Sequence, residues 1–288
     1  GTWMNVIGTS EKAKNIGFPA TPRDGADIEI IALVYYVLTH LDKLNREGKY
    51  KYNNVKTQEG EISFFDWAEK IEKNFEKYFY TKNNNHEYLY KEYISLERDI
   101  DHEMQLRPNV FIAMAISPEL FIKQHVINFL KIAEKYLVVP NSIGIRTLDY
   151  SDKEYSSVYD IKNDGYDYQL AHGFNLHNGS LCVWINGYYL LVKLIFDDLI
   201  NYKKLIFEIS QKLSKFQEFL KKSKWSGLPG MIDNDEELFP NLCGTQVISI
   251  GILIEVVEKL FEYKKCKDSN SNRNSIKNYK KNVKKSMI

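Results

Sequence analysis

The stretch that decides the fold is residues 20–41, ATPRDGADIEIIALVYYVLTHL, where a polar, turn-forming opening leads into a long apolar run. Thr21 can cap a helix, Pro22 suits the first helical position, and Asp24 occupies the place of a capping-box acid. The run that follows is apolar on nearly every side, and a helix of that kind is usually enclosed by other helices. The stretch therefore predicts a buried helix inside a helix-rich protein.

Two further segments carry clear helical signals. Residues 64–79 place apolar side chains at three- and four-residue spacing with charges between them, which is typical of an amphipathic helix at the surface. Ser117, Pro118 and Glu119 repeat the start signals before an apolar segment that ends at Pro140. Both segments are therefore predicted to be helical.

The second half of the chain adds more predicted helices. Residues 184–199 and 245–263 have few polar positions and are expected to be buried, whereas residues 205–220 are amphipathic. Residues 148–179 are rich in Asp, Tyr, Asn and Gly without a sustained period, so they are expected to form a long ordered loop of the kind that carries function. Because convincing strands are scarce, we predict an all-α fold in which buried and amphipathic helices form two layers.

The overall composition is that of a folded protein without a strong net charge. The chain has 288 residues, of which 44% are hydrophobic, and its formal net charge is +1. It can fill a sizeable core, and its overall charge does not point to nucleic acid. Residues 264–288 differ, because Lys and Arg dominate them and apolar residues are almost absent. We expect a disordered basic tail there, with a solvating role first and binding to an anionic partner second.

The cysteines and the opening residues bear on the compartment. Cys182, Cys243 and Cys266 are odd in number and lack metal-ligand spacing, so neither a disulfide framework nor a zinc site is expected, and a reducing, cytoplasmic compartment fits. Neither a signal peptide nor a membrane span is expected from the apolar runs. Because Gly1 is not an initiator methionine, we expect the chain to be part of a longer protein.

The loops between the predicted helices combine Trp, Arg, Asn, Asp and His with Gly or Pro. Carbohydrate sites are built in this way, because a sugar offers apolar ring faces for aromatic stacking and hydroxyls for short planar hydrogen-bonding groups. These segments are called the motif loops below. They are TWMN (2–5), TPRDG (21–25), QLRPN (105–109), GIRTLD (144–149), GFNLHNG (173–179), KWSGLPG (224–230) and, nearer the end, CGTQ (243–246).

The sequences of the motif loops and their order resemble the successive sequence motifs of the eukaryotic-type glycogen debranching enzymes, in their C-terminal amylo-alpha-1,6-glucosidase domain. The resemblance runs from the first residues to about Tyr263, so we expect residues 1–263 to form this domain. It implies an (α/α)6 barrel, a toroid with an inner and an outer ring of helices. About half of the ring can be found here, so we expect only its later part, with inner-helix surface left for other segments to cover.

The resemblance also implies a function. Such an enzyme is cytosolic, takes part in glycogen breakdown, and hydrolyses the single glucose left on an α-1,6 branch with inversion of configuration. Its partner would be glycogen or another branched α-glucan, and an upstream segment is a candidate partner that would complete the barrel. The family resemblance implies no cofactor, no metal, no nucleic acid and no membrane.

The two carboxyl groups that this chemistry needs are expected to be missing. Inverting hydrolysis uses an acid that protonates the leaving oxygen and a base that activates water, about 6.5 to 9.5 Å apart. By resemblance, Asn5 stands at the position of the acid and Gly244 at that of the base. An asparagine cannot donate a proton as a general acid at neutral pH, and glycine has no side chain. Further acid positions of the family correspond to Gly230, Leu181 and Glu103, of which only the last keeps a carboxylate.

The resemblance assigns sugar binding to side chains that the motif loops retain. They are Trp3, Arg23, Asp24, Gln105, Arg107, Asn109, His177, Trp184 and Trp225. Structural roles compete with this assignment. Asp24 could equally cap a helix, Arg107 could brace its loop by pairing with nearby acids, and His177 could be an ordinary buried histidine. Tryptophan is also more often a core residue than a ligand.

Two functions therefore stand side by side. The first is an amylo-alpha-1,6-glucosidase domain of glycogen catabolism whose activity is in doubt because both carboxylates are substituted. The alternative is a catalytically inactive, glucan-binding pseudoenzyme. Binding to glycogen without release of glucose would separate them.

Overall fold

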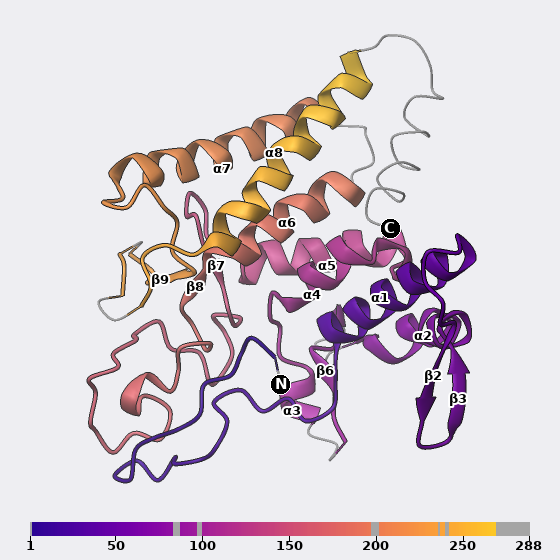
Figure 1. Cartoon of the computed structure of the whole chain (residues 1–288). Helices are drawn as coiled ribbons and strands as arrows, with labels where there is room; N and C mark the ends of the chain where they lie inside the picture. Colours follow the sequence, from indigo (N-terminus) through magenta and orange to yellow (C-terminus); the bar gives the residue numbers. More distant parts are fainter. Residues whose placement is uncertain are drawn as a thin grey trace.

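The computed structural model describes residues 2–82, 87–96, 100–196, 202–235, 237–239 and 242–268, and helices dominate it (Figure 1). The helices in this part of the chain are α1 (Ile28–Arg46), α2 (Phe64–Phe79), α3 (Ile100–Glu103), α4 (Asn109–Ile116), α5 (Lys123–Tyr136), α6 (Val183–Phe196), α7 (Tyr202–Lys222) and α8 (Val247–Asp268). The expected all-α character is therefore compatible with the structure.

The strands are short, and the sequence analysis did not predict them. They are β1 (Ala26–Asp27), β2 (Asn54–Thr57), β3 (Gly60–Ser63), β4 (Tyr80–Lys82), β5 (Tyr88–Tyr90), β6 (Tyr93–Ile94), β7 (Ile145–Arg146), β8 (Leu181–Cys182) and β9 (Met231–Ile232). Antiparallel pairs join β1 to β6, β2 to β3 and β4 to β5, and β8 lies between β7 and β9 in a small antiparallel sheet. These strands tie together loops rather than forming a layer of their own.

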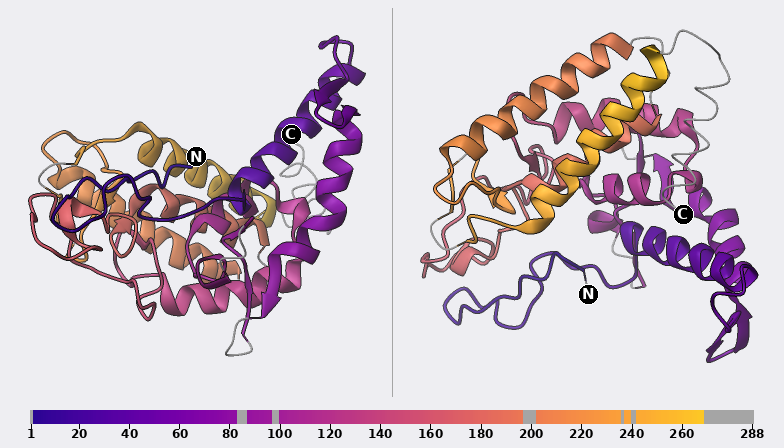
Figure 2. Two further views of the ribbon diagram at one scale, coloured as in Figure 1. Left: turned by 90° about the horizontal axis from the view of Figure 1, so that it is seen from below. Right: turned by 45° about the horizontal axis from the view of Figure 1, so that its top comes forward.

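The helices form two layers. In the first layer, α1 packs against α4, α4 against α6, and α6 against α8. In the second, α2 packs against α1, while α5 and α7 contact α6. Figure 2 shows α7 and α8 at one end of the assembly and the pair of α1 and α2 at the other. The described part of the chain is thus a row of four neighbouring helices with further helices on its outside.

The core lies between the two layers and is rich in aromatic side chains. Phe111 of α4 makes edge-on contacts with Phe129 of α5 and Tyr189 of α6, at ring separations of 5.8 and 5.3 Å. Such pairs stabilise a core beyond the burial of their area. The sequence analysis missed α4 itself, because residues 109–116 are apolar throughout and carry no periodic polar positions; nearly all of them are buried.

The predicted start of the first helix was wrong. The chain is not helical from Thr21 to Asp27, of which Ala26–Asp27 form β1, and α1 begins only at Ile28. The Thr21 hydroxyl does not cap the helix, because it donates to the carbonyl oxygen of Met4 at 3.3 Å. Asp24 is exposed and lies before β1, so the capping role considered for it is also excluded.

The expectation that α1 would be buried on all sides was wrong as well. Ile28, Ala32, Tyr35 and Leu38 are buried, but Leu33 and Val37 are 37% and 50% exposed. Since these two lie one turn apart, they form a short apolar strip on the open side of the helix.

The last helix has a longer exposed apolar face. In α8, Val247, Ile254 and Phe261 recur every seven residues and are 86%, 64% and 60% exposed, with Ile250 and Val257 between them. These five residues are called the α8 stripe below. The opposite face of α8 is buried against α6, so α8 is also buried on one side only. Both ends of the row of helices therefore present apolar side chains to the outside.

Other predictions were confirmed. The helix α2 has the predicted bounds, and Ser63 caps it by accepting a hydrogen bond from the backbone N–H of Asp66 at 3.0 Å. The loop 148–179 is ordered and contains only a short 3₁₀ turn, at Ala171–Gly173. The expected tail, 264–288, begins inside α8, which continues to Asp268, and its remainder lies outside the described residues. None of the described helices combines the length and the apolar character that a membrane-spanning segment needs.

Candidate functional site

The motif loops lie at the starts of the four neighbouring helices. TPRDG precedes α1, QLRPN precedes α4, GFNLHNG precedes α6, and CGTQ precedes α8. Backbone hydrogen bonds join these starts: Val183 N–H donates to the Gly230 carbonyl oxygen at 2.9 Å, and Gln246 N–H donates to the Leu228 carbonyl oxygen at 2.7 Å. Because the N-terminal end of a helix carries partial positive charge, this edge of the molecule suits electron-rich groups such as sugar hydroxyls.

Trp3 is packed into a corner between two of these helix starts. Its indole N–H donates to Oδ1 of Asn109 at 2.8 Å, and its ring meets His177 and Trp184 edge-on at 4.9 and 5.1 Å. These four residues are called the Trp3 corner below. The structure thus brings together four of the predicted sugar-binding residues, and the partly buried Trp3 and Trp184 leave some aromatic surface accessible there.

Arg107 braces the loops around this corner. Its Nε and Nη2 groups donate to Oε1 of Gln105 at 3.0 and 2.8 Å. Its Nη1 group donates to the carbonyl oxygens of Thr147 and His177, and Nη2 also donates to Oδ1 of Asn178. The residue is 3% exposed, and burial lowers its pKa to about 10, so it stays charged at neutral pH. The guanidinium is engaged on every nitrogen, with carbonyl and amide oxygens and not with the acids that the sequence suggested.

Arg23 forms a buried clamp with three carboxylates. Both Nη groups donate to the two oxygens of Glu29 at 2.6 Å, and the guanidinium lies 3.0 Å from Asp27 and 3.1 Å from Glu92. The Arg23 side chain is 4% exposed. Glu92 also accepts a hydrogen bond from Nδ2 of Asn109, which connects this Arg23 clamp to the Trp3 corner. Arg23 and Asn109 were predicted to bind sugar, and both are buried in structural contacts.

The carboxylates of the Arg23 clamp are perturbed. Burial raises the pKa of Asp27 to about 6, although the nearby guanidinium of Arg23 acts in the opposite direction. Burial also raises the pKa of Glu92, against the charge of Arg23. Three carboxylates face the guanidinium of Arg23 in a place with little solvent, and the charge of Arg107 also acts on Glu92.

Gln105 belongs to a second network on the other side of Arg107. Its Nε2 group donates to Glu154 at 3.0 Å, and the ring of His102 lies 3.1 Å from the other oxygen of Glu154. These hydrogen bonds, that from His102 above all, lower the pKa of Glu154 to about 2. Gln105 is buried as well. It therefore positions Arg107 and is not directly accessible to a ligand.

His177 is buried and electrically neutral. Burial, assisted by the charge of Arg107, lowers its pKa to about 3, so the ring is uncharged at neutral pH. Its Nδ1 atom has no hydrogen-bond partner in the part of the chain that the structure describes. A buried polar atom without a partner costs free energy, and this nitrogen is closed to solvent in the structure, so a sugar hydroxyl would reach it only if the Trp3 corner opened.

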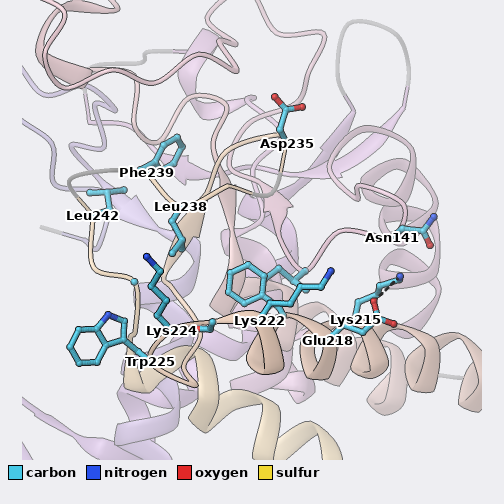
Figure 3. Close-up of a pocket in the computed structure, with 14 residues that line it drawn as sticks. Asn141, Lys215, Glu218, Lys222, Lys224, Trp225, Asp235, Leu238, Phe239 and Leu242 are labelled. Carbon is cyan, nitrogen blue, oxygen red and sulfur yellow. Dashed lines mark hydrogen bonds and ion pairs between the residues drawn. The ribbon is translucent and has the colours of Figure 1, made fainter.

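Asn5 and Gly244, the two positions predicted to have lost a catalytic carboxyl, lie in open surroundings. Asn5 is exposed in the loop that carries Trp3. Gly244 lines a cavity of about 900 Å³ with Trp225, between the end of α7 and the loop that follows β9 (Figure 3). An atom added in the Cβ position of Gly244 would have only Leu238 Cδ1 within 4 Å, at 3.7 Å. This cavity is called the Gly244 pocket below.

Gly230, Leu181 and Glu103, predicted by resemblance to occupy further acid positions, lie in three different surroundings. An added Cβ at Gly230 would lie 2.1 Å from Oε1 of Gln246, so the Gln246 amide fills the space that a side chain would need. Leu181 is fully buried in the small sheet. Glu103 keeps a carboxylate, but it is buried, bonded to Lys91 at 2.6 Å, and accepts a hydrogen bond from a backbone N–H. None of these three positions offers an accessible carboxylate.

Several participants in the site were missed by the sequence analysis. Glu92, Glu154 and His102 lie outside the motif loops, and no spacing connects them to Arg23 or Arg107. Glu29 could have been proposed as a partner of Arg23 from the sequence, because both lie in the stretch of residues 20–41. No three His, Cys, Asp or Glu side chains converge as metal ligands among the described residues, and Cys182 and Cys243 are free thiols.

Comparison with known proteins gives a concordant result. The protein-family model described as amylo-alpha-1,6-glucosidase matches residues 1–255. The glycogen debranching enzyme of Saccharomyces cerevisiae is 32% identical over 293 residues, which cover 91% of this chain and 19% of that protein. The chain therefore spans about a fifth of the length of this relative.

Proposed function

Because the chain belongs to the amylo-alpha-1,6-glucosidase family of glycogen debranching enzymes, we propose that it binds branched α-glucan at its motif loops and does not hydrolyse the branch glucose at an ordinary rate. The observation that carries the proposal is the pair Asn5 and Gly244. Neither can act as the proton donor or the base of an inverting glycosidase.

The buried carboxylates around the Trp3 corner do not replace this pair. Asp27, Glu29 and Glu92 are held in the Arg23 clamp, and Glu154 is bonded to His102 and Gln105. Asp24 is exposed and close to Arg23 in the chain, so it is suited to hold a sugar hydroxyl. A single exposed acid does not supply both roles of the reaction.

Sugar contacts remain possible at the edge formed by the helix starts. Trp225 is 81% exposed and supplies a free aromatic face, and His177 supplies an unbonded ring nitrogen if the Trp3 corner opens. Trp3 and Trp184 add partly exposed aromatic surface. These groups can stack on a sugar ring or bond to its hydroxyls without performing chemistry.

We also propose that the row formed by α1, α4, α6 and α8 is an arc of the inner ring of an (α/α)6 barrel, within a domain of residues 1–263. The apolar strip of Leu33 and Val37 at one end and the α8 stripe at the other support this view, since each is a surface on which a further helix could pack. An upstream helical segment is the partner that would cover them. The cytoplasm is the compartment in which the family meets its substrate.

The first test asks whether the purified chain hydrolyses the branch glucose of a singly branched dextrin. No release of glucose above the blank is expected, because the barrier is lowered only when both carboxyls act. The Asn5→Asp/Gly244→Glu variant serves as the comparison, since Gly244 has room for a side chain. Glucose release by the unchanged chain at a rate typical of a carboxylate pair would contradict the proposal.

The second test asks whether the motif loops bind branched α-glucan, and it uses co-sedimentation of the chain with glycogen. We expect the chain to sediment with the polymer, and the Trp225→Ala variant to bind less. Trp67→Ala is the matched control, because Trp67 is a partly exposed tryptophan on α2, away from the motif loops. If the unchanged chain stays in the supernatant at every glycogen concentration, or if both variants behave alike, the motif loops do not bind glucan.

A further inference from the structure

Residues 6–20 and the loop 148–179 meet at the surface, and aromatic rings are exposed where they meet. Phe18 is 55% exposed and Tyr168 is 44% exposed, and their ring centroids lie 6.4 Å apart with the ring planes tilted by 56°. Tyr166, two residues before Tyr168, is 82% exposed. Figures 1 and 2 show both segments on the side of the molecule away from α2. The pair of Phe18 and Tyr168 is called the aromatic platform below.

The backbone under the aromatic platform is held by hydrogen bonds. Asn15 is fully buried; its Nδ2 group donates to the carbonyl oxygen of Tyr168 at 3.0 Å, and its Oδ1 atom accepts from the Ser10 N–H at 2.9 Å. The backbone N–H of Phe18 donates to the Asn15 carbonyl oxygen at 3.1 Å. The Tyr168 ring also packs edge-on against the buried Phe174 at 5.5 Å. Both aromatic side chains therefore start from an ordered backbone, which lowers the entropic cost of binding a ligand.

The charges around the aromatic platform are nearly balanced. Lys12 is paired with Asp164 across the same two segments. The charged side chains of residues 9–18 and 160–170 are Lys12, Lys14 and Lys162 against Glu11, Asp160, Asp164 and Asp167. A surface with balanced charge and two aromatic faces favours a neutral ligand that offers apolar faces and hydroxyls, and an α-glucan chain is such a ligand.

The aromatic platform is continuous with the motif loops. Phe18 follows Trp3 in the same N-terminal segment, and Nδ2 of Asn178, in GFNLHNG, donates to the carbonyl oxygen of Ala20 at 3.5 Å. A branched α-glucan whose branch lies at the motif loops has a main chain that continues past them. The aromatic platform offers a surface on which this continuation can lie.

We propose that the aromatic platform binds the α-1,4-linked main chain of a branched α-glucan, with one sugar ring on Phe18 and a neighbouring ring on Tyr168. Because successive glucose units of such a chain turn relative to one another, two tilted aromatic faces suit it better than a flat surface. The inference rests on the proposed function for the identity of the sugar. It adds the part of the polymer that this surface holds.

The experiment measures binding of maltoheptaose, a linear α-1,4 glucan, to the protein by titration calorimetry. The Phe18→Ala/Tyr168→Ala variant is expected to bind it about tenfold more weakly, because each lost stacking contact lowers the affinity a few-fold. The Phe18→Trp variant is expected to bind it a few-fold more tightly, since an indole offers a larger face. A gain in affinity does not arise from a loss of folding, so this variant tests the contact itself.

Phe65→Ala is the matched control. Phe65 is 55% exposed, as Phe18 is, and it lies on α2, away from both segments. This variant should bind maltoheptaose with unchanged affinity. Tyr168→Phe keeps the ring and should also leave the affinity unchanged, which separates stacking from a contact of the hydroxyl group.

Three results would overturn the proposal. The first is an unchanged affinity for maltoheptaose in the Phe18→Ala/Tyr168→Ala variant, and the second is an equal loss in Phe65→Ala. The third is self-association of the unchanged protein that the double variant loses, measured by size-exclusion chromatography at increasing concentration. That result would identify the aromatic platform as a protein interface.

The aromatic platform and the proposed function can fail separately. If Trp225→Ala lowers sedimentation with glycogen while the double variant binds maltoheptaose normally, the platform is wrong and the proposed function stands. If the double variant loses maltoheptaose while Trp225→Ala sediments normally, the platform is supported and the binding role of Trp225 is wrong.

Discussion

The Trp3 corner and the Gly244 pocket belong to the same row of helix starts, yet they differ in almost every physical respect. The corner and its supports are buried, and their polar groups are bonded to one another through Asn109, Arg107 and the Arg23 clamp. The pocket is open, Trp225 at its edge is 81% exposed, and among the described residues only Leu238 would lie within 4 Å of a Cβ added at Gly244. The buried corner is held by contacts that the fold needs, whereas the open pocket leaves side chains such as Trp225 without such contacts.

This difference shows why a retained motif is ambiguous. Arg107 and Asn109 were predicted by resemblance to bind sugar, but each holds loops together by hydrogen bonds that the fold needs. Selection for folding would keep them even if the chain never met a sugar. A retained Trp225 has no such structural explanation, because its side chain is exposed. Free residues at the open edge are therefore the better indicators of binding.

The largest expected effect is in the Arg23 clamp. Arg23→Met leaves Asp27, Glu29 and Glu92 without their shared cation, and removing one partner of a buried ion pair costs about 3–5 kcal/mol. Urea unfolding at neutral pH measures the loss. The control is Arg46→Met, since Arg46 is paired with Asp42 at the surface, where such a pair contributes at most about 1 kcal/mol. Equal losses in the two variants would show that the clamp is not structural.

A smaller effect separates two tryptophans. Trp3→Ala removes the hydrogen bond to Asn109 and the contacts with His177 and Trp184, and we expect it to lower the free energy of unfolding by about 2–3 kcal/mol. Trp225→Ala should change it by less than about 0.5 kcal/mol, because the side chain is 81% exposed. Thermal or urea unfolding measures both. A Trp225 variant as unstable as the Trp3 variant would remove the distinction between corner and pocket.

The smallest effect is a dependence of stability on pH that arises in the buried region. The pKa of Asp27 is raised to about 6 from its usual 3.8, so its contribution is present below about pH 3.8 and is lost as the pH rises through about 6. Glu154 acts oppositely: its pKa is lowered from 4.5 to about 2, so its contribution is present above about pH 4.5 and is lost as the pH falls through about 2.

Each dependence can be removed by one amide substitution. Asp27→Asn should flatten the curve of unfolding free energy between about pH 4 and pH 6, and Glu154→Gln should flatten it between about pH 2 and pH 4.5. One proton corresponds to at most about 1.4 kcal/mol for each pH unit. Urea titrations across this range measure the slopes, and Trp225→Ala should keep the original profile. An unchanged slope in Asp27→Asn would mean that its burial does not perturb it.

Local signals explain what the sequence predicted well. The helix α2 has a capping serine at its start and an amphipathic pattern along its length, so its bounds could be read from neighbouring residues alone. The order of the motif loops was sufficient for the family, which the comparisons confirm. The length and order of the loop 148–179 also followed from composition.

Contacts between residues far apart in the chain explain the features that the sequence predicted badly. Thr21 has the chemistry of a helix cap, but its hydroxyl bonds to the backbone of Met4, and the segment up to Asp27 pairs with β6. Glu92 is central to the Arg23 clamp, yet nothing near it in the sequence marks it as a site residue. The apolar helix α1 predicted enclosure, whereas its neighbours cover one side only.

The α8 stripe has a consequence for how the protein behaves with salt. Its five apolar side chains are driven toward contact by sulfate and similar salts, which strengthen the burial of apolar surface. Raising the concentration of such a salt should therefore favour the packing of a further helical segment on this face of α8.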